Sequence, residues 1–76
     1  MQNKYKNYIE SLKEKTKLNL PERRILDRST RIEELEDVML NLNNIKDQVI
    51  IKKEIYRQNI ELISMIEKWL RINKAS

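Results

Sequence analysis

The sequence contains no cysteine, histidine, glycine or phenylalanine, and only one proline among its 76 residues. Without cysteine and histidine there is no thiolate nucleophile, no imidazole base, no disulfide and no zinc site of the thiolate or imidazole kind. Without glycine there is no phosphate-binding loop and no dinucleotide fingerprint, and tight turns lose their usual source of positive φ. We therefore expect a non-enzymatic protein without catalytic residues, cofactor or metal site.

Long apolar segments are also missing. No apolar run exceeds three residues, as in Val49-Ile50-Ile51, and Met1 to Asn7 leads into no apolar segment. A membrane-spanning helix needs about 20 apolar residues and a secretory signal needs an apolar core, so we expect a cytoplasmic protein without membrane contact. A chain of this length buries only about 60–65% of its unfolded surface, and we therefore expect one domain that is completed by oligomerisation.

The composition is biased toward lysine, isoleucine and asparagine, which make up 29 of the 76 residues. We interpret this bias as a sign of AT-rich coding sequence, as in low-GC bacteria, their phages and their mobile elements. The charge is distributed unevenly. Residues 1–31 carry nine basic and four acidic groups, a net charge of +5, whereas residues 32–76 carry seven basic and eight acidic groups, a net charge of −1. Such asymmetry is typical of chains that bind nucleic acid or an acidic protein.

Helical periodicity dominates the first third of the chain. Four apolar or aromatic residues share one helical face, namely Tyr5, Tyr8, Ile9 and Leu12. This spacing predicts a helix over about 3–17. Asn19 lies three residues before Glu22, which is the spacing of a capping box, and proline suits the first turn of a helix. A second helix is therefore predicted to begin near Pro21.

Two interpretations of the next segment stay open. Ser29-Thr30 consists of weak helix formers, which favours a short helix over 21–28 followed by another over 31–43. The heptad spacing of the apolar residues continues across this junction, however, and predicts a single helix over 21–43 instead. We slightly favour the break.

Three asparagines in Asn41-Leu42-Asn43-Asn44 predict a turn, because asparagine tolerates the left-handed conformation that glycine would otherwise supply. Beyond the turn, apolar residues that recur at helical spacing over a broad face predict a long helix over 46–73. We expect an all-α bundle of three or four helices in which 31–43 pairs antiparallel with 46–73. The first helix then packs across this hairpin or swaps onto a partner. A change of apolar register argues against one uninterrupted helix over 31–73.

Basic residues form the first candidate binding surface. On a helix Arg24, Arg28 and Arg31 would line up as one ridge, and guanidinium groups bind phosphate or carboxylate with two parallel hydrogen bonds. Arg23 and Arg31 have acidic neighbours at helical spacing, whereas Arg28 has none, and the alternative is a merely solvated face. The candidate contacts to a polyanion or an acidic partner are Arg23, Arg24, Arg28, Arg31, Lys13 and Lys17.

Apolar residues of the predicted last helix form the second candidate surface, because they spread more widely than one short helix can cover. The candidate partner or oligomer contacts are Ile51, Ile55, Leu62, Met65, Ile66 and Trp69. We therefore expect a small protein-interaction module, an adaptor or an inhibitor, which associates with itself or with another protein and takes no small-molecule substrate. The alternative is a DNA- or RNA-binding transcriptional regulator that uses the basic N-terminal half.

Overall fold

The structure, a computed structural model, describes residues 5–75, and these residues fold into three helices without any strand. The helices are α1 (Lys6–Glu14), α2 (Leu20–Asn41) and α3 (Ile45–Ala75). The prediction of an all-helical protein is thus confirmed. The helix predicted over 3–17 is shorter at its C-terminal end, where Lys15 already has an extended backbone, and residues 3 and 4 lie outside the described part.

Helix α2 begins at the predicted capping box. The Asn19 side chain accepts a hydrogen bond from the Glu22 backbone N–H at 2.9 Å, and the Glu22 carboxylate accepts one from the Asn19 N–H at 3.1 Å. Pro21 occupies the first turn, where its missing N–H costs nothing. The capping-box prediction is therefore confirmed.

The break that we slightly favoured at Ser29-Thr30 is wrong, since α2 is continuous through this point. The Thr30 hydroxyl donates to the Leu26 carbonyl at 3.1 Å, which satisfies the hydroxyl inside the helix. Ile25 and Ile32 flank the junction and are both buried in the core. Burial of both isoleucines requires a straight helix here, and this packing outweighs the weak local propensity.

The turn lies at residues 42–44, as predicted, but its geometry differs from the prediction. No residue in the described range 5–75 has a positive φ, so no asparagine takes the left-handed conformation. Leu42 ends α2 in an extended conformation, and its carbonyl accepts a hydrogen bond from the Gln48 side chain at 2.6 Å. The Asn44 side chain accepts from the Lys46 N–H at 2.8 Å. Side-chain hydrogen bonds therefore replace the backbone conformations that glycine would allow.

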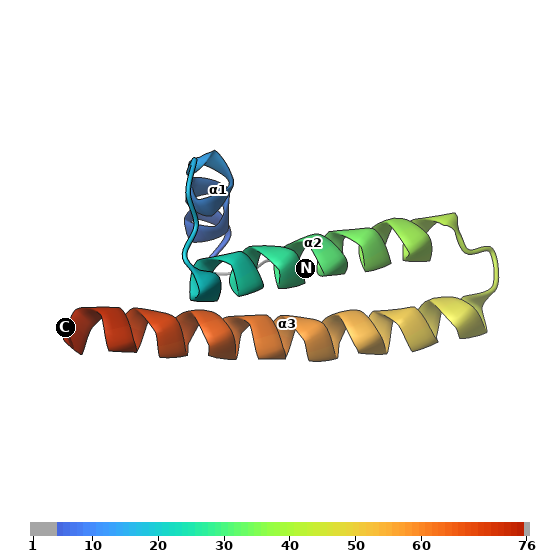
Figure 1. Ribbon diagram of the computed structural model, residues 1–76. Helices are drawn as coiled ribbons and strands as arrows, with labels where there is room; N and C mark the ends of the chain where they lie inside the picture. Colours follow the sequence, from blue (N-terminus) through green and yellow to red (C-terminus); the bar gives the residue numbers. More distant parts are fainter. Residues whose placement is uncertain (1–4, 76) are drawn as a thin grey trace.

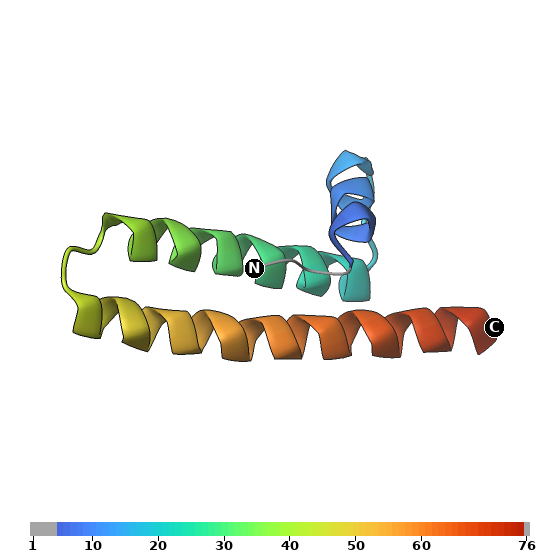
Figure 2. The ribbon, with the colours of Figure 1, turned by 180° about the vertical axis from the view of Figure 1, so that it is seen from behind.

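Helices α2 and α3 run side by side in opposite directions, and Figures 1 and 2 show this pair from the front and from behind. Because the chain turns back at 42–44, the uninterrupted helix over 31–73 does not form. At about 1.5 Å per residue the 31 residues of α3 span about 46 Å, close to the longest molecular dimension of 48 Å. The 22 residues of α2 span only about 33 Å, so the C-terminal part of α3 extends past the start of α2.

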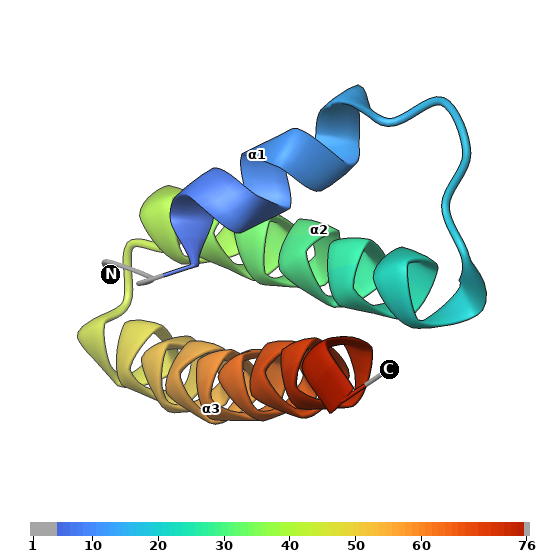
Figure 3. The ribbon, with the colours of Figure 1, turned by 90° about the vertical axis from the view of Figure 1, so that its left-hand side faces the viewer.

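Helix α1 lies across the N-terminal half of α2, as Figure 3 shows in the view turned by 90°. A helix of nine residues is marginal in water on its own, so its stability depends on packing. Ile9 and Leu12 of α1 are buried in the same core as Ile66 of α3. The Tyr5 hydroxyl also donates to Glu67 at 3.0 Å, which ties the start of this segment to α3. Within the part of the chain that the structure describes, α1 does not extend over the other half of the hairpin, toward the turn.

Two features are absent from the described residues. None of the helices within residues 5–75 combines the length and the apolarity that crossing a bilayer requires. In the same range no three acidic side chains come together in a way that would hold a metal ion.

Candidate functional site

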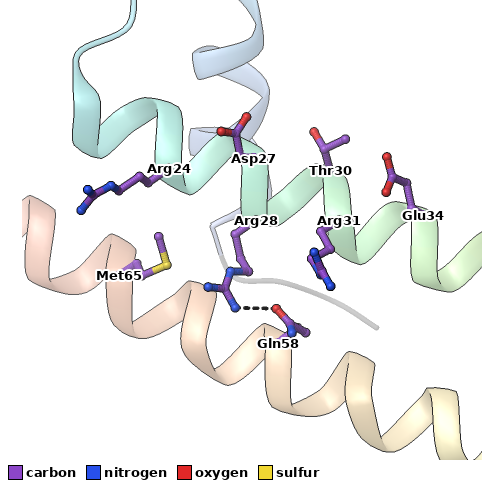
Figure 4. Close-up of a pocket in the computed structure, with 8 residues that line it drawn as sticks. All are labelled: Arg24, Asp27, Arg28, Thr30, Arg31, Glu34, Gln58 and Met65. Carbon is purple, nitrogen blue, oxygen red and sulfur yellow. Dashed lines mark hydrogen bonds between the residues drawn. The ribbon is translucent and has the colours of Figure 1, made fainter.

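The predicted arginine ridge forms one wall of an open groove of about 540 Å³ between α2 and α3. In Figure 4 the side chains of Arg24, Arg28 and Arg31 extend from α2, and Gln58 and Met65 belong to α3. The spacing of four and three residues is what aligns the three guanidinium groups on one side of the helix.

Arg28 is used inside the molecule. Its Nη1 donates to Gln58 Oε1 and to Glu61 Oε2, both at 2.5 Å. Glu61 also accepts from Arg57 at 2.9 Å, and Arg57 in turn pairs with Glu54. Arg28 has no acidic residue three or four positions away on its own helix, and the structure supplies Glu61 from α3. This network joins the two long helices beside the core.

Charge pairing within this network lowers the pKa of one carboxyl group. Hydrogen bonds from Arg57, and then from Gln58, hold the pKa of Glu54 below its usual value of 4.5. Glu54 therefore stays ionised at neutral pH and is a fixed negative charge beside the Arg57 guanidinium. The pairs of Arg57 with Glu54 and Glu61 stand at the helical spacings of three and four residues.

The other predicted basic contacts have different surroundings. Lys13 bridges α1 to α2 through Glu33 at 3.0 Å, and this carboxylate raises the pKa of Lys13 above its usual value. Four of the predicted basic side chains are exposed and make no ion pair with any described residue: Lys17, Arg23, Arg24 and Arg31. Among residues 5–75 these four side chains thus form no ion pair, whereas Arg28 and Lys13 are paired.

The residues predicted as partner contacts lie mainly inside the molecule. Three of them are buried in the core, Ile55, Leu62 and Ile66, and three are half-buried against it, Ile51, Met65 and Trp69. Helices α1 and α2 together cover this apolar face of α3, which from the sequence was wider than one short helix can cover. The three buried isoleucine and leucine side chains are therefore part of the core instead of a free interface.

Trp69 packs beside the hydroxyl end of Tyr8. The Tyr8 oxygen is buried and makes no hydrogen bond of ordinary geometry with a described residue. Burial raises the pKa of Tyr8, and the Trp69 side chain nearby opposes part of this shift. Trp69 also lines a hollow of about 280 Å³ together with Ile25 and the exposed Leu20. Trp69 thus contributes to the packing of α1 and α2 against the C-terminal part of α3.

A different set of apolar residues is exposed on α3. Four of them stand at offsets of four, seven and four residues, and we call them the apolar stripe: Ile45, Val49, Tyr56 and Ile60. Their exposed fractions run from 45% to 75%. Successive residues of an α-helix turn by about 100°, so the four side chains fall within about 60° of arc.

The apolar stripe ends before the part of α3 that is contacted by Tyr5, the residue in front of α1. Glu67, seven residues after Ile60, lies on nearly the same side of the helix and accepts the hydrogen bond from Tyr5. In the sequence these residues cannot be distinguished from the core positions, because both belong to one broad apolar face of the predicted helix. Only the packing of α2 and α1 separates the covered face from the uncovered one. The spacing of four, seven and four residues was visible in the sequence and is the signal that could have identified the uncovered face.

Comparisons with known proteins yielded no relative: no protein-family model, no curated protein and no solved structure matches the chain.

Proposed function

We propose that this protein is a non-enzymatic interaction module that binds a partner protein through the apolar stripe on α3. The observation that carries the proposal is the alignment of four exposed apolar side chains on a face of α3 that neither α1 nor α2 covers. Single exposed apolar residues are normal, whereas an aligned set of them marks a contact surface. An adaptor or an inhibitor would act through such a surface, because binding alone is its activity.

The test uses two neighbouring positions of α3 that face different directions. Val49→Asp places a charge on the apolar stripe, and Ile50→Asp places the same charge one residue further on, outside the stripe, at a side chain that is 63% exposed. The wild-type protein and both variants are used as baits, and a captured protein is identified, purified and measured by calorimetry. We expect Val49→Asp to weaken binding at least tenfold and Ile50→Asp to leave it unchanged, with far-UV circular dichroism confirming equal helix content. Equal binding by both variants refutes the proposal.

A second function, binding to a polyanion such as DNA or RNA, is supported by the exposed guanidinium groups of Arg23, Arg24 and Arg31, which make no ion pair with a described residue. Phosphate contacts of this kind release counterions, so affinity falls steeply with salt. Arg24→Glu combined with Arg31→Glu should abolish binding to mixed-sequence duplex DNA at low salt. Arg28 is unsuitable for this test because its side chain bonds to Gln58 and Glu61 of α3, so its substitution would also change the contact between the two helices. Lys68→Glu, another exposed basic residue, serves as the control for a change of charge. Absence of binding by the wild-type protein at low salt excludes this second function.

A further inference from the structure

The surroundings of the apolar stripe narrow the class of partner, and this inference rests on the proposed function. Basic side chains flank the stripe on both sides. Lys46 and Lys53 lie on one flank and Lys52 on the other, as their positions relative to Val49 and Tyr56 on the helix require. All three lysines are exposed, and none of them forms an ion pair with a described residue.

The surface of the apolar stripe is also hollowed between Val49 and Tyr56. A depression of about 360 Å³ is lined by Val49, Tyr56 and the two lysines Lys52 and Lys53. Lysine contributes an aliphatic stem to such a wall and keeps its ammonium group at the rim in water. The depression therefore suits an apolar side chain whose neighbours carry negative charge.

From this arrangement we infer that the partner presents an amphipathic helix whose apolar seam is flanked by aspartate or glutamate. The seam covers the apolar stripe, one apolar side chain enters the depression between Val49 and Tyr56, and the acidic flanks pair with Lys46, Lys52 and Lys53. A stripe only about 60° wide matches the narrow seam between two helices, which is typical of coiled-coil contacts.

The same charges argue against a second copy of this chain as the occupant, and the narrow width of the apolar stripe argues against a membrane surface. A second copy of this chain would bring lysines on both flanks of one stripe against lysines on both flanks of the other, in either relative orientation, and like charges at such a seam are unfavourable. A membrane surface with anionic lipids would also attract lysines, but a helix lying in that surface needs a wide apolar face. The apolar stripe does not widen on the flank opposite α2, because the charged residues Lys53 and Arg57 lie there. The Arg57 guanidinium pairs with Glu54 and Glu61.

The experiment uses the whole protein and two designed helical peptides of three heptads. Both peptides have the same leucine seam, which is flanked by glutamates in one and by lysines in the other, and each is dye-labelled and used where it is monomeric alone. Binding is measured by fluorescence anisotropy. We expect the glutamate-flanked peptide to bind the wild-type protein at least tenfold more tightly than the lysine-flanked one. The combined substitution Lys52→Glu and Lys53→Glu should reverse this preference, and Val49→Asp should abolish both interactions, whereas the uncharged substitution Ile50→Asn, which adds no acid beside Lys46 and Lys53, should change neither.

The outcomes separate this inference from the proposed function. Equal affinity for the two peptides, or a preference that the double lysine variant leaves unchanged, overturns the inference of an acidic helix, while the proposed function is still supported if Val49→Asp abolishes binding of the identified partner. A wild-type dimer in sedimentation that Val49→Asp dissociates identifies a second copy as the occupant and overturns the inference. Sedimentation with vesicles containing phosphatidylglycerol, if lost in the same variant while neither peptide binds, identifies a membrane and overturns it as well. If Val49→Asp changes none of these measurements, the proposed function fails too.

Discussion

Ile66 is the side chain on which the three helices depend most, and its truncation gives the sharpest test of this fold. The residue is 0% exposed and lies in the core with Ile9 and Leu12 of α1 and Ile25 of α2. Ile66→Ala removes buried apolar volume that the surrounding side chains can refill only in part. Substitutions of this kind cost about 2–5 kcal/mol. For a chain of this length the whole free energy of unfolding is about 4–11 kcal/mol, so the variant should lose a large share of its stability.

The matched control is Ile50→Ala on the same helix. Ile50 is 63% exposed, so the substitution removes little buried area, and its effect should stay within about 0.5 kcal/mol. Both changes replace isoleucine by alanine inside α3, and the gain in helix propensity is therefore the same and cancels in the comparison. The difference between the two variants reports burial alone.

Urea unfolding followed by far-UV circular dichroism, with Trp69 fluorescence as a second probe, measures both free energies. We expect Ile66→Ala to lower the midpoint of urea unfolding strongly and to lower the melting temperature by at least about 8 °C, because each kcal/mol shifts it by about 4–8 °C in a domain of this size. A difference of less than about 1 kcal/mol between the variants would show that Ile66 does not lie at the centre of the packing.

Three further predictions concern the polar contacts. Asn19→Ala should cost about 1 kcal/mol in urea unfolding, because it leaves a first-turn N–H of α2 without its acceptor; no loss would contradict the capping box. Lys15, together with the backbone N–H of Asn19, holds the pKa of Glu22 below 4.5, so this contribution to stability is complete above the unfolded-state pKa and is lost as the pH falls below 4.5 through the folded-state pKa. Glu22→Gln should therefore flatten the acid limb of the melting temperature against pH, and an unchanged limb would exclude this role. A double-mutant cycle between Arg28→Ala and Glu61→Ala should give a coupling of about 0.5–1 kcal/mol, since the pair is partly exposed; additive effects would mean that the interhelical pair contributes nothing.

Helix content followed from local properties of the chain. Apolar residues recur at helical spacing, and polar residues stand at the helix boundaries, with Asn19 capping the start of α2 and two asparagines in the turn 42–44 between α2 and α3. Capping is a contact between residues three positions apart, so it can be read without knowing the fold. The same holds for the pairs of Arg57 with Glu54 and Glu61.

Contacts between distant residues could not be predicted in this way. Ser29-Thr30 has low helix propensity, yet α2 continues through it because Ile25 and Ile32 are buried on the two sides of it. Arg28 has no partner within four residues, and its acceptors Gln58 and Glu61 lie thirty and thirty-three residues away. These contacts depend on how α2 and α3 are placed against each other.

The sequence by itself determined that the chain is helical, that a helix begins at the Asn19 capping box, that the chain turns near 42–44, and which chemistries its residues lack. The tertiary structure alone decided which apolar residues are covered. Ile60 and Ile66 are the same amino acid on the same helix, but Ile66 faces α1 and α2 and is buried, whereas Ile60 faces away from both and is half-exposed. Periodicity shows that apolar side chains share a helix face, but their burial depends on the second element that packs against it.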